Sequence, residues 1–412
     1  MNKSKYIYRC TDCGMEYDSA ATMYLCPSCC KSQLHDEPPR GVLKTIYDYN
    51  EVRNRVLSFE GLREKGFIDL LPVETIASLP SLRVGNTPLY HVTELGGERI
   101  PFGLYLKDDS QNPTWSFKDR ASALVSAYAV EKGYGTIIAA STGNAGSSLA
   151  GICAAQRQKA VIVVPETAPQ AKLTQIIMYG ATIVPVKGTY DEAFDLSVKA
   201  TETFGWYNRN TAFNPLTIEG KKTASFELYY QLHHSVPDRI FIASGDGVIL
   251  SGICKGFEDL LHLGIIERMP VIVAVQSDKS DNLVRNIGPD KFHIIPSTTL
   301  ADSISVDIPR NFHMARQFIR QYHGETLTVT DDAILSASGL LSANTGLFAE
   351  PAAAAAFAGF LSYYRDGILQ PESSNVVLLT GSGLKDPAAV APLTGMPPSV
   401  YPSLENLERL LR

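Results

Sequence analysis

From about residue 118, short apolar runs rich in β-branched residues alternate with longer stretches whose apolar residues recur every three to four positions. The runs at 136–141, 160–165 and 181–186 predict buried strands, and the stretches between them predict helices. A second series begins near residue 214 and predicts further strands in DRIFIAS, PVIVAVQS and NVVLLTG. Such alternation is typical of parallel βα units, so we expect an α/β fold with two doubly wound lobes.

The chain has 412 residues, which is enough for two lobes and an appendage. Its first 40 residues lack helical periodicity and end in a Pro-Pro-Arg-Gly break, so we expect residues 1–40 to form a separate small module. Residues 41–118 together with 214–412 are expected to form the larger lobe. Residues 119–213 are expected to form the smaller α/β lobe.

The composition indicates a folded globular protein, with 45% hydrophobic and 19% charged residues. A formal net charge of -6 argues against a nucleic-acid partner, which requires a basic face. The sequence shows neither the apolar core of a signal peptide nor a run of about 18 apolar residues. We therefore expect a cytoplasmic protein that has neither nucleic acid nor a membrane as a partner.

Five of the seven cysteines lie between residues 10 and 30, which is typical of metal binding rather than of a disulfide scaffold. Two C-x2-C pairs can offer four thiolates to one tetrahedral Zn²⁺ ion. These ligands are Cys10, Cys13, Cys26 and Cys29. Cys30 leaves the choice of the fourth ligand open, and reduced thiols without metal are the alternative. With four protein ligands, we expect the zinc to be structural, in a zinc-ribbon-like module.

Three turns that follow predicted strands have the composition of anion-binding or polar contact sites. IASGDGVILSG at 242–252 leads into a helix, and its N–H groups suit a phosphate. These N–H groups belong to Gly245, Asp246, Gly247, Val248 and Ile249. STGNAG at 141–146 could hold a carboxylate, and TGSGLKD at 380–386 places a hydroxyl where it could meet a ring nitrogen. An ordinary tight turn is the alternative interpretation of the first segment, and in STGNAG the Asn and Gly residues could only shape the turn.

The segment NPTWSFKDR at 112–120 places Lys118 just ahead of a predicted helix. A lysine beside Asp119 is usually a solvated surface residue, and Lys118 alone is weak evidence of chemistry. Together, however, NPTWSFKDR, STGNAG, NPLTIEGKKT, GDGV, EPAAAA and TGSGLKDP resemble, in order and separation, the threonine synthases and their relatives. These are fold-type-II pyridoxal-phosphate enzymes of the tryptophan synthase beta-like superfamily. The resemblance covers roughly residues 80 to 390.

The resemblance implies a fold-type-II architecture whose larger lobe binds pyridoxal phosphate. It implies that Lys118 forms a Schiff base with the cofactor and moves protons, and that Phe117 packs near the ring. Asn144 would contact the 3-hydroxyl, and Thr380 would face the pyridine nitrogen. A neutral hydroxyl there suits elimination and replacement better than transamination. The substrate carboxylate would be bound at Ser141, Thr142 and Ala145.

The implied reaction is that of a lyase of amino-acid biosynthesis, which converts O-phosphohomoserine and water to threonine and phosphate. A homodimer is usual in the family, and some members carry a zinc-ribbon-like N-terminus. One alternative is a related enzyme that eliminates or replaces a β-substituent on serine, threonine or an O-activated serine. A second is a homologue without activity that binds a ligand or partner.

Three residues depart from the family pattern. The family usually has Gly where this chain has Trp115, Thr where it has Ala145, and often Arg near Thr217. The last two departures remove a hydroxyl and a cation from the region expected to recognise the substrate. Because a phosphate ester needs charged or multiply hydrogen-bonding partners, losing an Arg there lowers the expected affinity unless another cation compensates. The candidates are Arg209, Lys221 and Lys222.

Overall fold

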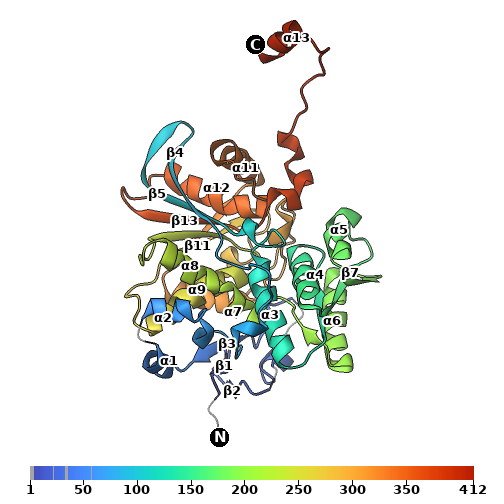
Figure 1. Ribbon diagram of the computed structural model, residues 1–412, viewed down its shortest axis with the longest axis vertical. Coiled ribbons are helices and arrows are strands. Elements are labelled where there is room, and N and C mark those ends of the chain that lie inside the picture. The colour runs from blue at the N-terminus through green and yellow to red at the C-terminus, as the bar shows by residue number, and fades with distance from the viewer. Residues whose placement is uncertain (1–3, 22, 33–35, 57) are drawn as a thin grey trace.

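The computed structural model describes residues 4–21, 23–32, 36–56 and 58–412, and these form three β-sheets with helices packed around them (Figure 1). The helices are α1 Tyr49–Arg55, α2 Phe59–Glu64, α3 Lys118–Glu131, α4 Asn144–Gln156, α5 Gln170–Met178, α6 Tyr190–Phe204, α7 Leu216–Lys221, α8 Thr223–Gln231, α9 Val248–His262, α10 Phe312–Gln321, α11 Asp331–Thr345, α12 Pro351–Arg365 and α13 Leu404–Leu411.

The largest sheet has six strands in the order β12-β11-β10-β13-β5-β4. Its strands are β4 Leu89–Leu95, β5 Glu98–Asp108, β10 Arg239–Ala243, β11 Val271–Ser277, β12 Glu325–Val329 and β13 Ser374–Leu379. All neighbours are parallel except β4 and β5, which form an antiparallel pair at one edge. Parallel strands need crossover connections, and helices supply them here.

Both faces of this sheet are buried, as its nearly continuous apolar strands predict. Ile240 and Ile242 of β10 point into a core shared with α8, α9 and α10. Phe241 and Ala243 point the other way, into a second core formed with α11 and α12. The alanine run of α12 lies in this second core, where small side chains let the helix pack closely on the strands.

The second sheet has the strand order β8-β7-β6-β9 and is parallel throughout. Its strands are β6 Thr136–Ala140, β7 Lys159–Pro165, β8 Thr182–Val186 and β9 Tyr207–Asn208. One face packs on α6, and the other faces α3 and α4. The sequence therefore located β6, β7 and β8 correctly, and the predicted α/β fold class is confirmed.

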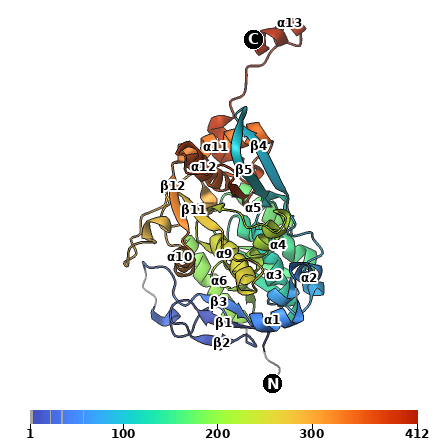
Figure 2. The same cartoon turned by 90° about the vertical axis from the view of Figure 1, so that its left-hand side faces the viewer.

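A small antiparallel sheet of β2 Glu16–Asp18, β1 Tyr6–Cys10 and β3 Leu43–Tyr47 lies at the base of the molecule (Figure 2). Hydrogen bonds join the end of β3 and the start of α1 to helices α7 and α9. The Tyr47 hydroxyl donates to Glu219 at 2.7 Å, and the Tyr49 hydroxyl donates to Asp259 at 2.6 Å. Both carboxylates also accept from the buried Lys222 ammonium, so this sheet adjoins a buried ion-pair network.

Helix α7 lies between α3 and α9. The segment TIEGKKTASFELYYQL, residues 217–232, has the pattern of one helix, but the structure has two, because α7 ends at Lys221 and α8 begins at Thr223. The segment YNEVRNRVLSFEGLREKG, residues 49–66, also has a helical pattern and also contains two helices, α1 and α2. The close approach of α7 to α3 depends on Gly220, where a Cβ would lie 2.2 Å from the carbonyl oxygen of Arg120.

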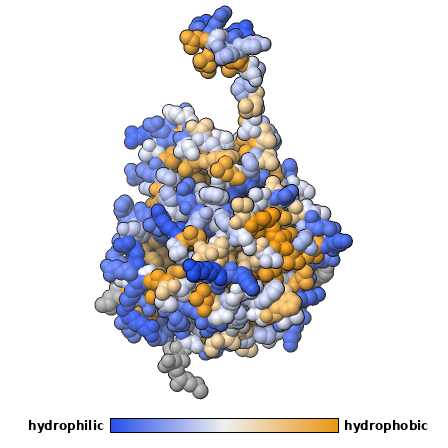
Figure 3. All heavy atoms as spheres, turned by 45° about the vertical axis from the view of Figure 1, so that its right-hand side comes forward, coloured by the Kyte–Doolittle hydropathy of each residue, from blue (hydrophilic) through white to orange (hydrophobic). Residues whose placement is uncertain are grey.

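The helical pattern of SLENLERLLR, residues 403–412, corresponds to α13, which stands clear of the body on an extended segment (Figures 1 and 3). Its apolar and polar side chains are both exposed. In the described part of the chain, no helix is both long and apolar enough to cross a bilayer.

We predict that Gly220→Ala destabilises the protein by about 1–3 kcal/mol, because the added methyl group must push α7 away from α3. Gly339→Ala in α11 is the matched control, since its Cβ would meet only Leu393 at 3.8 Å. That variant should gain about 0.5–1 kcal/mol of helix propensity. Urea unfolding measures both, and equal stability of the two variants would contradict this packing.

Candidate functional site

Three backbone segments meet at the start of α3. The N–H of Phe117 donates to the Thr380 carbonyl at 2.8 Å, and the N–H of Ser382 donates to the Trp115 carbonyl at 3.1 Å. The N–H of Glu350 donates to the Gly381 carbonyl at 3.0 Å. The structure thus places the beginnings of α3 and α12 beside the end of β13. Residues that are more than 200 positions apart in the sequence share one site.

Lys118 is the first residue of α3, and its ammonium interacts with the charge of Glu350, the residue that precedes α12. Lys118 as a whole keeps some solvent-exposed area, but protein surrounds its ammonium group. This burial lowers the pKa of the ammonium. Glu350 and Asp246 oppose the shift, whereas Arg209 adds to it. Among the described residues, none forms an ion pair with Lys118. A lysine in this setting is ready to act as a nucleophile or a base.

The helix α9 begins at a turn that suits an anion. Gly247 is its N-cap residue, with φ of +80°, and a Cβ there would lie 2.8 Å from the Leu283 side chain. The Asp246 carboxylate accepts a hydrogen bond from the backbone N–H of Arg310 at 3.0 Å. This contact holds the acid on the neighbouring loop. The free N–H groups of the first turn and the helix dipole favour a negative charge.

A second helix, α4, begins at Asn144 in the same region. Ser141, Thr142 and Ala145 are partly exposed around its first turn, where backbone N–H groups can meet a carboxylate. The Asn144 amide nitrogen donates to both carboxylate oxygens of Glu350, at 3.0 and 2.9 Å. Asn144 therefore connects the start of α4 to the start of α12.

Phe117 and Thr380 border the same space. Phe117 is fully buried, with the Arg120 guanidinium 5.4 Å from its ring centre. Within the part of the chain that the structure describes, the Thr380 hydroxyl has no hydrogen-bond partner, whereas its carbonyl oxygen binds Phe117. Its hydroxyl is thus available to a ligand.

The sequence alone did not single out Glu350 or Lys385. Burial raises the pKa of Glu350 and lowers that of Lys385 to about 8. The Lys385 ammonium donates to Ser147 at 2.9 Å and to the carbonyl of Thr114 at 3.3 Å. Glu350 begins the segment EPAAAA, and Lys385 lies in TGSGLKDP. The first segment has the pattern of an apolar helix and the second that of a glycine-rich turn, and neither pattern indicates that a charged side chain is buried there.

The cysteine cluster is separate from this site. The Sγ atoms of Cys10, Cys13, Cys26 and Cys29 all lie within 4.8 Å of one another. Cys10 and Cys29 are 3.8 Å apart, as are Cys13 and Cys26. Zn–S bonds of about 2.3 Å place sulfurs about 3.8 Å apart in a tetrahedron. Cys30 lies outside the set, with its Sγ 3.7 Å from the carbonyl oxygen of Pro27.

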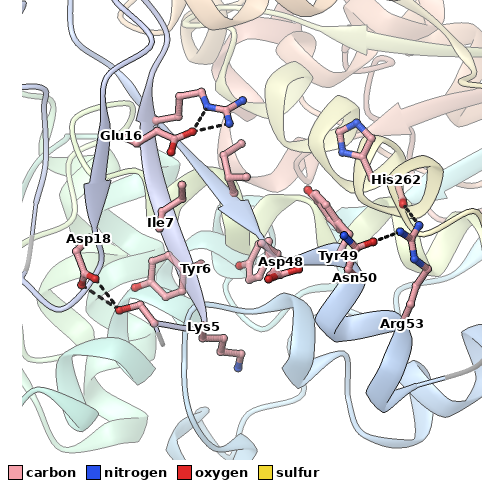
Figure 4. A pocket seen from close by; sticks show the side chains of 14 residues that line it. Lys5, Tyr6, Ile7, Glu16, Asp18, Asp48, Tyr49, Asn50, Arg53 and His262 are labelled. Atoms are coloured by element: carbon pink, nitrogen blue, oxygen red, sulfur yellow. Dashed lines mark hydrogen bonds and ion pairs between the residues drawn. The ribbon is translucent and has the colours of Figure 1, made fainter. Parts of the chain in front are cut away.

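A hollow of about 880 Å³ opens between the small antiparallel sheet, α1 and the end of α9 (Figure 4). Its polar side chains bind one another. Arg9 pairs with Glu16, Ser4 donates to Asp18, and Arg53 donates to the carbonyl of His262. None of the residues gathered around Lys118 lines this hollow, so it is distinct from the candidate site.

Comparison with known proteins gives consistent results. Residues 80–381 match the family model described as pyridoxal-phosphate dependent enzyme. A threonine synthase from Methanocaldococcus jannaschii is 34% identical over 98% of this chain and 99% of its own. A threonine synthase from Methanosarcina acetivorans is 31% identical over 98% of both chains.

Solved structures share the fold at lower identity. The processed form of threonine deaminase isoform 2 from Solanum lycopersicum superposes with a TM-score of 0.67 at 21% identity, covering 82% of this chain and 94% of that one. Diaminopropionate ammonia lyase from Escherichia coli gives a TM-score of 0.64 at 17% identity, covering 77% and 90%.

Trp115, three residues before Lys118, has φ of +64° and a half-exposed side chain. A left-handed conformation costs a residue with a Cβ about 1–2 kcal/mol. Glycine avoids that cost, although it adds about 0.4–1 kcal/mol of unfolded-chain entropy. The preference of the family for Gly here has this physical reason.

We predict that Trp115→Gly stabilises the protein by about 0.8 kcal/mol, the difference between the midpoints of these two terms. Trp115→Ala removes the same ring but keeps the strained backbone, so it should bring no gain. Thermal unfolding of the wild type, Trp115→Gly and Trp115→Ala measures these differences. An equal gain in stability in the two variants would contradict the role of backbone strain.

Proposed function

The chain belongs to the family of pyridoxal-phosphate dependent enzymes, and on that premise we propose that it acts as a threonine synthase. The reaction converts O-phosphohomoserine and water to threonine and phosphate. Threonine synthases at 31–35% identity, two of them matched almost end to end, support this function. The observation that carries it in the structure is the unpaired Lys118 between the starts of α4 and α9.

The residues present fit pyridoxal phosphate. The first turn of α9, from Gly245 to Ile249, would hold the phosphate through its N–H groups. Asn144 and the free hydroxyl of Thr380 would meet the polar atoms of the ring, and Phe117 would pack beside it. Lys118 would be the point of covalent attachment. The N–H groups at the start of α9, the Thr380 hydroxyl and the Lys118 amine are available to a ligand in this structure, whereas the Asn144 amide donates to Glu350.

When bound, the cofactor supplies an electron sink that acidifies protons near the substrate's amino-bearing carbon. The Lys118 amine, with its pKa lowered by burial, takes the α-proton and returns protons at the neighbouring carbons. The neutral Thr380 hydroxyl does not bring a negative charge to the ring nitrogen, and this favours elimination and replacement.

The start of α4 would orient the amino acid. Ser141, Thr142 and the N–H groups up to Ala145 would bind its carboxylate, because the N-terminus of a helix attracts anions. The Asn144 to Glu350 contacts hold this turn in place on the side of α12. The α-carbon would then lie beside Lys118.

The proposal also includes a structural zinc ion bound by Cys10, Cys13, Cys26 and Cys29. Four thiols with tetrahedral separations support it, and they leave no open position for a substrate. In agreement with the resemblance, we further propose a cytoplasmic homodimer that has neither nucleic acid nor a membrane as a partner. The small antiparallel sheet, whose strand β1 ends at the ligand Cys10, would be held against α7 and α9 by the hydrogen bonds of Tyr47 and Tyr49.

We predict that the cofactor-loaded protein forms threonine and phosphate from O-phosphohomoserine and shows a visible absorption band. Lys118→Ala should lose both, because no other group replaces its amine, whereas Lys159→Ala, which removes an exposed lysine, should lose neither. A Lys118-dependent band without turnover of this substrate would move the assignment to elimination or replacement on serine or threonine. A colourless wild-type protein would favour a homologue without activity.

Metal analysis should give about one zinc ion per chain. Cys13→Ser should lower the zinc content towards zero and reduce the melting temperature, because one of four ligands is lost. Cys30→Ser is the matched control and should leave both unchanged, since Cys30 lies outside the cluster. Zinc loss in the Cys30 variant alone would contradict the ligand assignment.

A further inference from the structure

Six lysine and arginine side chains are buried in the described part of the chain, and they fall into two groups. Four form ion pairs with carboxylates: Lys107, Arg120, Lys222 and Lys255. Arg209 and Lys221 form none. An unpaired buried cation is strongly unfavourable, so these two exceptions indicate an anion that belongs in the site.

Arg209 is fully buried directly after β9. Its Nε donates to the Ser122 hydroxyl at 3.1 Å, and its Nη1 donates to the Thr211 hydroxyl at 3.1 Å. Its Nη2 is buried without any partner among the described residues. Since Ser122 lies one turn after Lys118 on the same face of α3, this guanidinium lies beside the lysine.

Lys221 approaches from the other side. It is the last residue of α7, and its Cβ packs against Gly252 of α9, where a methyl group would lie 2.6 Å away. Its ammonium extends back along α7 to the Thr217 carbonyl, at 3.2 Å, which is its one hydrogen bond among the described residues. Burial, and then the charges of Arg209 and Lys118, lower its pKa well below the usual value. An anion between them would relieve this repulsion.

The third candidate, Lys222, is excluded. Its ammonium binds Glu219 and, at 2.7 Å, Asp259, so two carboxylates already balance its charge and it does not call for an anionic ligand. The Thr217 hydroxyl is also engaged, since it donates to the Asn214 carbonyl at 2.8 Å. Of the three candidates, Arg209 and Lys221 are therefore the buried cations near Lys118 that have no carboxylate partner.

We propose that Arg209 and Lys221 bind the phosphate group of the substrate, which restricts the enzyme to amino acids whose leaving group is a phosphate. This inference rests on the proposed function and assigns its substrate-recognition residues. The start of α9 already offers N–H groups to the cofactor phosphate, and Arg209 reaches the site from β9 and α3 instead. Arg209 is thus a donor separate from the N–H groups of α9, and Lys221 approaches the same space from α7.

The test compares the cofactor-loaded wild type with Arg209→Met, Arg209→Lys and Lys221→Met. Lys199→Met, which removes an exposed lysine of α6, is the control for net charge. Calorimetry gives the Kd of inorganic phosphate, turnover gives kcat and KM for O-phosphohomoserine, and the visible band gives the Kd of the cofactor. Thermal unfolding checks that each variant folds.

Loss of a charged hydrogen bond should raise the Kd of phosphate and the KM by about 10- to 100-fold in Arg209→Met and Lys221→Met. Arg209→Lys, which keeps the charge and the fold but loses the two-pronged geometry, should show a smaller increase. The Kd of the cofactor should change less than about twofold, well below the tenfold that one lost interaction brings. The control should match the wild type.

Unchanged phosphate binding in Arg209→Met and Arg209→Lys would overturn the inference, and so would weaker cofactor binding with phosphate binding intact. Failure of the proposed function looks different. If the wild type binds phosphate in an Arg209-dependent way but leaves O-phosphohomoserine unchanged, the anion site stands and the assigned reaction fails.

Discussion

Buried positive charge is the constraint on which the rest of this structure depends. A lysine or arginine that leaves water needs a carboxylate, several hydrogen bonds or a bound anion to be stable. The protein meets this need in two ways. Away from the site, carboxylates neutralise every fully buried cation that the structure describes. Around Lys118, Arg209 and Lys221, they do not.

The paired cations fix the elements that carry the unpaired ones. Arg120, two residues after Lys118, binds Asp109 at the end of β5 and Glu227 on α8, at 2.5 and 2.6 Å. Lys222, next to Lys221, binds Glu219 and Asp259, which joins α7 to α9. Each of these paired cations thus lies close in the sequence to an unpaired one. Breaking such a buried pair costs about 3–5 kcal/mol, so the scaffold resists rearrangement around the charged site.

The sequence was sufficient for features that depend on local pattern. Strands β6, β7 and β8 are rich in β-branched residues and could be located directly. Strand β9, Tyr207–Asn208, could not, because two residues show no periodicity and its pairing with β6 is formed by distant parts of the chain. The ambiguity between Cys29 and Cys30 was likewise a question of where the side chains point.

The candidate site shows the same limit. The motifs located the turns at 141–146 and 245–249, since glycine spacing is a local property. They did not distinguish Arg209, Lys221 and Lys222, any of which could compensate for the Arg that the family often has near Thr217. Only the structure separates them, because whether a cation has a partner depends on Glu219 and Asp259, the latter 37 positions away from Lys222. A short segment does not show which charges are balanced, because the partners come from distant parts of the chain.

Lys118 is the residue to which we assign the cofactor, although burial also lowers the pKa of Lys221 and Lys385 in the same region. Borohydride reduction of the cofactor-loaded protein, followed by digestion and mass spectrometry, identifies the lysine to which the cofactor is attached. We expect the label on the peptide that contains Lys118, with Lys221 and Lys385 unmodified. A label on either of those two lysines, with Lys118 unmodified, would contradict the assignment.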